Sequence, residues 1–140
     1  MQNTDKKILV QIDGSECSLN AAKYAIKLAK DKMLSYLVST LLQAYGIASI
    51  LSGYSSTRES AILVQGSEGY DKKGKYCRAK TEIFTDVKSI VGSILDYATS
   101  KDIDLIVIGT KGRTGLKRFL MGSVANGVVQ HAHCPVLLVR

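Results

Sequence analysis

The sequence predicts an α/β protein in which helices cover both faces of an open parallel sheet. Short apolar runs alternate with segments whose apolar residues recur at helical spacing, which is the pattern of βαβ units. The run Leu105–Ile108 is apolar on both faces, as a central parallel strand requires. The length of 140 residues is that of one domain, and no repeat or linker divides it. We therefore expect a single domain over residues 1–140.

The chain opens with a strand and a helix. Ile8–Ile12 predicts a buried strand that ends at the polar and glycine residues from Asp13 onward. Ser15 is a suitable N-cap for the helix that follows, and Glu16 in its first turn favours the helix dipole. The helix of some fifteen residues is indicated by apolar side chains at helical spacing. These are Leu19, Ala22, Ile26, Ala29 and Met33.

Residues 34 to 78 carry the least regular pattern. Tyr36–Leu42 is apolar and β-branched, which favours a second strand. A loop or short helix fits residues 46 to 53. A helix also fits between about Ser56 and Arg78, although each glycine within it costs about 1 kcal/mol relative to alanine. The glycines concerned are Gly66, Gly69 and Gly74.

The second half of the chain has a sharper pattern. Lys80–Thr85 predicts a short strand at the sheet edge, and Asp86 is a suitable cap for the next helix. That helix carries Ile90, Val91, Ile94, Leu95 and Ala98 on one face. The central strand then ends in Gly109, a short helix is expected from about Ser123 to Ala132, and Pro135 begins a final strand.

Composition narrows the function classes. The net charge of +7 invites an anionic partner, but the basic residues are scattered and Trp is absent, so nucleic-acid binding is a weak alternative. Cys17, Cys77 and Cys134 indicate reduced thiols, and His131 and His133 lack the partners of a metal site. No apolar run approaches ~18 residues, and the polar N-terminus does not resemble a secretory signal. We expect a cytoplasmic protein without a membrane segment.

Polar and glycine residues follow two of the predicted strands. Asp13 ends the first strand, and Gly109 ends the later one. Ligands of open α/β sheets bind beyond the carboxyl ends of such strands. The loop after Gly109 leads to Gly122 and Ser123 at a helix start, where free N–H groups attract anions. Lys111 and Arg113 would neutralise phosphate charge, and on this chemistry alone a nucleotide site and a plain surface turn stay equally open.

The spacing of these glycines resembles a known family. Gly109-Thr110-Lys111-Gly112, nine further residues and then Gly122-Ser123 match the G-x-x-G-x9-G-[ST] pattern of ATP-binding universal stress proteins. Residues 7–15, 102–109 and 133–139 resemble the family's first, fourth and last strands. The likeness covers roughly residues 5–30 and 80–140, and the middle segment departs from it.

The resemblance implies a fold and a site. The fold is an open five-stranded parallel sheet of order 3-2-1-4-5, adenine nucleotide alpha hydrolase-like. Asp13 would bind the ribose, and the backbone near Leu41 would read adenine. The ligand would be ATP with Mg²⁺ or Mn²⁺, its phosphates lying near the glycines and the start of the last helix. Gln11 replaces the proline usual in the family. The expected site comprises Gln11, Asp13, Leu41, Gly109, Lys111, Gly112, Arg113, Gly122, Ser123 and Val124.

The expected function is that of an ATP-binding regulatory or stress-response module with little or no ATP turnover. No Ser/His/Asp set and no carboxylate pair is arranged for hydrolysis. The resemblance also implies a homodimer formed through the final strand. Its residues are Val136, Leu137, Leu138 and Val139. The alternative is an interaction protein that dimerises but has lost nucleotide binding.

Overall fold

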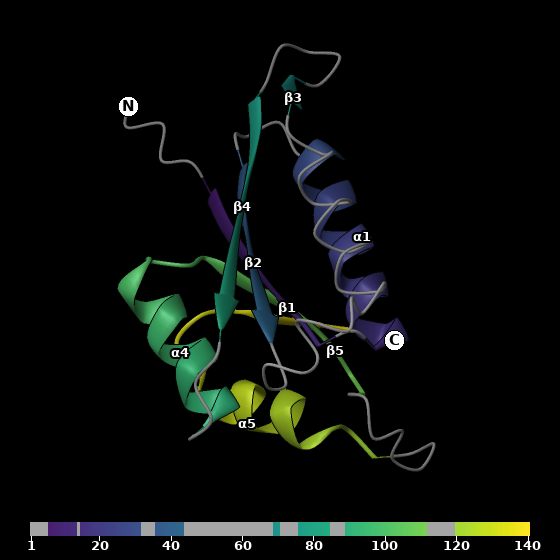
Figure 1. Cartoon of the computed structure of the whole chain (residues 1–140), viewed down its shortest axis with the longest axis vertical. Helices are drawn as coiled ribbons and strands as arrows, with labels where there is room; N and C mark the ends of the chain where they lie inside the picture. The colour runs from purple at the N-terminus through teal and green to yellow at the C-terminus, as the bar shows by residue number, and fades with distance from the viewer. Residues whose placement is uncertain are drawn as a thin grey trace.

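A computed structural model describes residues 6–13, 15–31, 36–43, 69–70, 76–84, 89–111 and 120–140. Figure 1 shows the helices and strands of this part of the chain. In chain order they are β1 (Lys6–Ile12), α1 (Glu16–Asp31), β2 (Tyr36–Gln43), β3 (Gly69–Tyr70), β4 (Tyr76–Phe84), α4 (Ile90–Ser100), β5 (Leu105–Gly109), α5 (Ser123–His131) and β6 (Val136–Val139). Of these helices, none is both long and apolar enough to span a bilayer.

The described strands form one sheet in the order β3-β4-β2-β1-β5-β6. β1 pairs in parallel with both β2 and β5, β4 pairs in parallel with β2, and β6 pairs in parallel with β5. The carboxyl ends of these strands therefore share one edge of the sheet. The expected α/β class is confirmed. The expected sheet had five strands, whereas six described strands form this sheet. The additional strand, β3, is antiparallel to the start of β4 and lies outside it.

Helices cover both faces of the sheet (Figure 1). On one face, Ile8, Val10 and Ile12 of β1 pack against α1. On the other face, Leu9 packs against α4 and α5, together with alternate residues of β5. Strands that are apolar on both faces belong in such a covered, central position.

The buried side of α1 is lined by small side chains. They are Ala21, Ala22, Ala25 and Ala29, whereas Ile26 is only partly buried. The sequence had placed Leu19 and Ile26 in the buried stripe and had not named Ala21 or Ala25; Met33 lies outside the described residues. Alanine fits here because α1 lies close to the sheet, which leaves little room for larger side chains.

The start of α4 corrects one expectation. The N-cap is Ser89, whose Oγ accepts a hydrogen bond of 3.1 Å from the N–H of Gly92. Asp86, which was expected to cap this helix, lies outside the described residues, and the N-cap position belongs to Ser89. Ser15 does cap α1 as expected, since its Oγ accepts from the N–H of Ser18 at 3.2 Å.

The end of α4 is a Schellman turn. The N–H of Ile103 donates to the carbonyl of Ala98 at 2.9 Å, and the N–H of Asp102 donates to that of Thr99 at 3.3 Å. Asp102 adopts a φ of 52°, the left-handed conformation that this turn requires and that glycine adopts most easily. Buried Ile103 then leads the chain into β5.

The sequence allowed a helix between residues 56 and 78, and this prediction is wrong for the residues of that range that the structure describes. Gly69–Tyr70 and the segment from Tyr76 onward are strands, and Cys77 pairs with Tyr36 of β2. The glycines in this range weaken a helix, whereas an extended chain gains the hydrogen bonds of the ladder with β2. The loop or short helix expected at residues 46–53 lies outside the described residues.

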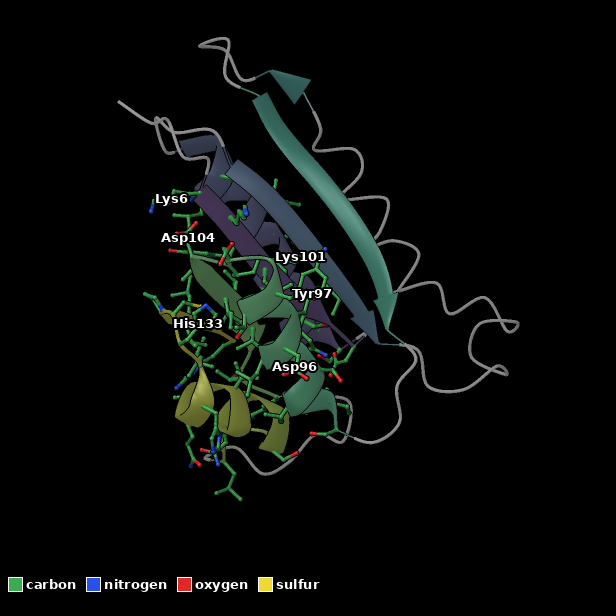
Figure 2. The ribbon with its side chains drawn as sticks, turned by 90° about the vertical axis from the view of Figure 1, so that its left-hand side faces the viewer. Lys6, Asp96, Tyr97, Lys101, Asp104 and His133 are labelled. Carbon is green, nitrogen blue, oxygen red and sulfur yellow. The ribbon has the colours of Figure 1, made fainter. Side chains whose placement is uncertain are left out.

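Asp104, just before β5, is bonded to the start of β1 at the amino-terminal end of the sheet, where Figure 2 shows it beside Lys6. Its carboxylate accepts from the N–H of Lys7 at 2.9 Å and pairs with Nζ of Lys6 at 3.3 Å. Nζ of Lys7 in turn donates to the carbonyl of Lys101, at the end of α4. The hydrogen bond from the Lys7 N–H, aided by the charges of Lys6 and Lys7, lowers the pKa of Asp104 below its ordinary value of 3.8, although partial burial opposes the shift.

Candidate functional site

The expected site residues of the first two strands lie at the carboxyl edge of the sheet. Gln11 of β1 is in register with Leu41 of β2, and both are close to the ends of their strands. Val10 pairs with Val107 of β5, so continuing this register brings Asp13 level with the residues that follow β5. The parallel pairing therefore places the ends of three strands, and the residues expected on them, along one edge.

Asp13 is a buried carboxylate directly after β1, with 8% of its surface exposed. Its Oδ1 accepts a hydrogen bond of 2.9 Å from the N–H of Ser15. Within the described part of the chain, no group donates to Oδ2. A carboxylate accepts up to about four hydrogen bonds, so this side chain retains capacity for a hydroxyl or N–H donor.

Ser15 connects the turn after β1 with the segment after β5. Its Oγ accepts from the N–H of Ser18 and donates to the carbonyl of Lys111 at 3.3 Å. The sequence identified Ser15 as an N-cap and missed this second contact. The available signal was its hydroxyl hydrogen, because capping uses only the oxygen and leaves that donor for a neighbouring strand end.

Gly109 packs directly against the first turn of α1. A Cβ atom at this position would lie 2.8 Å from the carbonyl carbon of Cys17 and 2.9 Å from the nitrogen of Ser18. Real Cβ atoms essentially never approach backbone this closely. Glycine is therefore required by helix packing here, whatever else the loop after β5 contacts.

The start of α5 is tied to the end of β5 by backbone hydrogen bonds. The N–H of Gly122, the N-cap of α5, donates to the carbonyl of Thr110 at 2.7 Å. The N–H of Thr110 donates to the carbonyl of Val139 at 2.9 Å. Thr110 thus links α5, β5 and β6, a role that its sequence position alone did not reveal.

The first turn of α5 has the character of an anion site. No side chain caps it, and it contains no acidic residue. The N–H of Gly122 is occupied by Thr110, and the first N–H groups of the helix itself, beginning with those of Ser123 and Val124, have no acceptor within the helix. Ser123 is exposed and Val124 partly exposed. Uncapped N–H groups and the positive end of the helix dipole favour a negatively charged ligand.

The remaining expected residues belong to the loop after β5. Lys111 is partly exposed and lies where the chain leaves the strand end. Gly112 and Arg113 lie outside the described residues. Among the residues that are described, no three His, Cys, Asp or Glu side chains gather into a metal-binding group.

Comparison with known proteins identifies relatives over nearly the whole chain. The model of the universal stress protein family matches residues 5–140. A universal stress protein of Methanocaldococcus jannaschii is 36% identical over 147 residues, covering 99% of this chain and 84% of its own length. The universal stress protein YxiE of Bacillus subtilis is 32% identical over 145 residues, covering 96% of this chain and 98% of its own length.

Solved structures share the fold. The universal stress protein UspA from Lactobacillus plantarum aligns with a TM-score of 0.71 and 26% identity, covering 99% of this chain and 100% of its own. A universal stress protein from Archaeoglobus fulgidus in complex with dAMP aligns with a TM-score of 0.65 at 17% identity, covering 99% of this chain and 100% of its own. Another, in complex with cAMP, aligns with a TM-score of 0.63 at 22% identity, covering 97% of each chain.

Proposed function

Because the chain belongs to the universal stress protein family, we propose that it binds an adenine nucleotide, ATP with Mg²⁺ or Mn²⁺, at the carboxyl edge of its sheet. One observation carries the proposal. The uncapped start of α5 is bonded through Gly122 and Thr110 to the end of β5, the strand beside β1, and β1 leads to the buried Asp13. The proposed anion site at the start of α5 and the buried acceptor Asp13 are thus both connected to the carboxyl ends of β1 and β5.

Each residue has a role that suits its chemistry. The free acceptor capacity of Asp13 suits a ribose hydroxyl. The N–H groups of Ser123 and Val124 and the Ser123 hydroxyl suit phosphate oxygens. Lys111, with Arg113, supplies positive charge against the phosphates. The backbone around Leu41 and Gln11 borders the base, and Gly109 and Gly112 border the ribose and phosphates.

The structures containing dAMP and cAMP support adenine nucleotides as the ligand class. The choice of a triphosphate rests on the spacing from Gly109 to Ser123, which resembles that of ATP-binding family members. Mg²⁺ commonly keeps several waters and is held by phosphates with one or two protein oxygens, so a site with few carboxylates suits it. The ion would offset phosphate charge.

The first test compares two serine variants. Ser123→Ala removes a hydroxyl at the start of α5, and Ser100→Ala removes one at the end of α4. Among the described residues, the Ser100 hydroxyl bonds only the carbonyl of Tyr97. Calorimetric titration with MgATP should give an affinity about three- to tenfold weaker for Ser123→Ala, the usual contribution of one hydrogen bond. Ser100→Ala should bind like the wild type. Equal affinities in all three proteins would refute the phosphate role of Ser123.

Gly122→Val addresses the whole anion site, because a branched side chain at the N-cap crowds the space that phosphates would occupy. We expect MgATP binding to be lost while the thermal transition remains cooperative.

The identity of the base is tested by denaturing the purified wild-type protein and identifying any released nucleotide by mass spectrometry. Sustained hydrolysis above about 1 s⁻¹, within the ordinary enzyme range, would overturn the assignment as a slow or inactive regulatory module.

We also propose a homodimer formed through β6, the last strand on its side of the described sheet. Leu138 of β6 and Val129 of α5 are exposed apolar side chains, and an unpaired strand edge is ready to pair with another. Light scattering should give twice the chain mass at micromolar concentration. Leu138→Lys should shift the population to monomer, whereas Lys23→Glu on the exposed side of α1 should not.

A second candidate function is that of a dimerising interaction protein without a nucleotide. It is favoured by the bond from Gly122 to Thr110, because the sequence had led us to expect that the N–H of Gly122 would be free for an anion. The two functions differ in one outcome. A dimer that shows no heat and no thermal stabilisation with any adenine nucleotide at millimolar concentration would establish the second and exclude the first.

A further inference from the structure

We propose that Ser15 is a positioning residue for the nucleotide phosphates and acts through Lys111. The proposal rests on the nucleotide-binding function proposed above and concerns a contact outside the expected set of site residues. Ser15 bonds to both halves of the site: its N–H donates to Asp13, and its hydroxyl donates to the carbonyl of Lys111.

The last residue of β5 and the two residues that follow it are each held by a different kind of contact. Gly109 is fixed by packing, because Cys17 and Ser18 leave no room for a Cβ atom. Thr110 is fixed by two backbone hydrogen bonds, with Val139 at 2.9 Å and Gly122 at 2.7 Å. Lys111 is held by the Ser15 hydroxyl, the one described group that bonds to it.

This arrangement gives the Ser15 side chain control over the position of Lys111. The two backbone bonds of Thr110 do not depend on which side chain that residue carries, whereas the contact of Lys111 depends on the side chain of Ser15. At 3.3 Å the contact is long for a hydroxyl donor, so the expected effect of losing it is modest. The hydroxyl oxygen simultaneously caps α1 by accepting from Ser18, so a test must separate capping from positioning.

Three substitutions make that separation. Ser15→Thr keeps the hydroxyl, so it retains both the cap and the donor. Ser15→Gly lacks the donor but remains a good N-cap, since glycine costs only a few tenths of a kcal/mol at this position. Ser15→Ala lacks the donor and is a poor cap. Calorimetry measures MgATP affinity, and thermal unfolding without nucleotide measures stability.

The inference predicts that affinity and stability rank the variants differently. Ser15→Thr should bind MgATP within about twofold of wild type, while Ser15→Gly and Ser15→Ala should both bind about threefold more weakly, as for one weak hydrogen bond. In stability, only Ser15→Ala should fall clearly below the others. If Ser15→Gly bound MgATP with wild-type affinity, or if only Ser15→Ala lost affinity, Ser15 would act only as a helix cap. The inference would then be wrong, although the proposal of nucleotide binding would be unaffected. Absence of MgATP binding by the wild type would overturn both.

Discussion

The N–H of Gly122 donates a 2.7 Å hydrogen bond to the carbonyl of Thr110, which joins the start of α5 to the end of β5. The N–H of the same Thr110 donates to Val139 in the last strand. One peptide segment therefore supports both the proposed phosphate site and the proposed dimer edge. A ligand at the start of α5 and a second chain at β6 would act on residues bonded to the same threonine.

Gly109→Ala should destabilise the protein. The added Cβ would meet the backbone of Cys17 and Ser18 at 2.8 and 2.9 Å, so α1 must shift away from the sheet. Overpacking of this kind costs about 1–3 kcal/mol in the free energy of unfolding. Urea denaturation measures the change.

Gly92→Ala is the matched control for that prediction. Its Cβ would meet the Oγ of Ser89 at 3.1 Å, and alanine gains about 1 kcal/mol over glycine inside a helix. We expect a change within about 1 kcal/mol of zero for α4, whose remaining packing is untouched. Equal destabilisation by the two substitutions would show that the contact of Gly109 with α1 is not the cause.

Asp102→Gly should stabilise the protein by about 0.5–1 kcal/mol. Asp102 has a φ of 52°, where a Cβ atom costs about 1–2 kcal/mol, and glycine relieves that cost while losing part of the gain to backbone entropy. Removing a carboxylate from the negative end of α4 adds to the effect. Asp102→Ala retains the Cβ atom, so a melting temperature at or above that of Asp102→Gly would contradict this explanation.

The pKa of Asp104 predicts an acid-dependent contribution to stability. The Lys7 N–H, with the charge of Lys6, lowers the pKa in the folded protein below the ordinary 3.8 of the unfolded chain. The stabilisation is therefore present above pH 3.8 and is lost as pH falls through the lower folded value. Asp104→Asn should lower the melting temperature at pH 7 and have a smaller effect near pH 3. A difference that does not change between these pH values would exclude this linkage.

Cys134 should react slowly with alkylating agents at neutral pH. Burial raises the pKa of its thiol, and the negative charge of Asp104 raises it further, while only the thiolate is nucleophilic. Asp104→Asn should speed alkylation at this residue, measured by mass spectrometry of its peptide at pH 7. An unchanged rate would show that access of the reagent to the Cys134 sulfur, and not the charge of Asp104, limits alkylation.

The sequence predicted best the strands whose ends are marked by a change in chemistry. β5 runs between Asp104 and the segment after Gly109, and β6 follows Pro135, so both were located to within a residue. β3 escaped prediction because two residues beginning with glycine have no periodicity. The choice of Ser89 over Asp86 as the cap of α4 also escaped, because both residue types cap helices and only the path of the chain decides between them.

Carboxyl ends of adjacent parallel strands meet at one end of a sheet, but the sequence alone did not show that the strands of Asp13 and Gly109 are adjacent. That adjacency was implied by the family resemblance, and the structure pairs the two strands. The contacts that connect this edge did not follow. Whether Ser15 reaches Lys111 depends on strand register and on how closely α1 packs, and both are set by tertiary contacts between distant residues. The role of Gly112, assigned through the family resemblance, and that of Arg113, assigned from its charge, remain predictions.

The location of the nucleotide is the central claim, and an amide-resolved NMR titration of the wild-type protein with MgATP tests it most directly. The account predicts saturable shifts at Ser123 and Val124, with smaller ones at Thr110, and fixed signals at Ser100, which lies at the end of α4. If the signals of Ser123 and Val124 stayed fixed at millimolar MgATP, the start of α5 would not be a phosphate site and the account would be wrong.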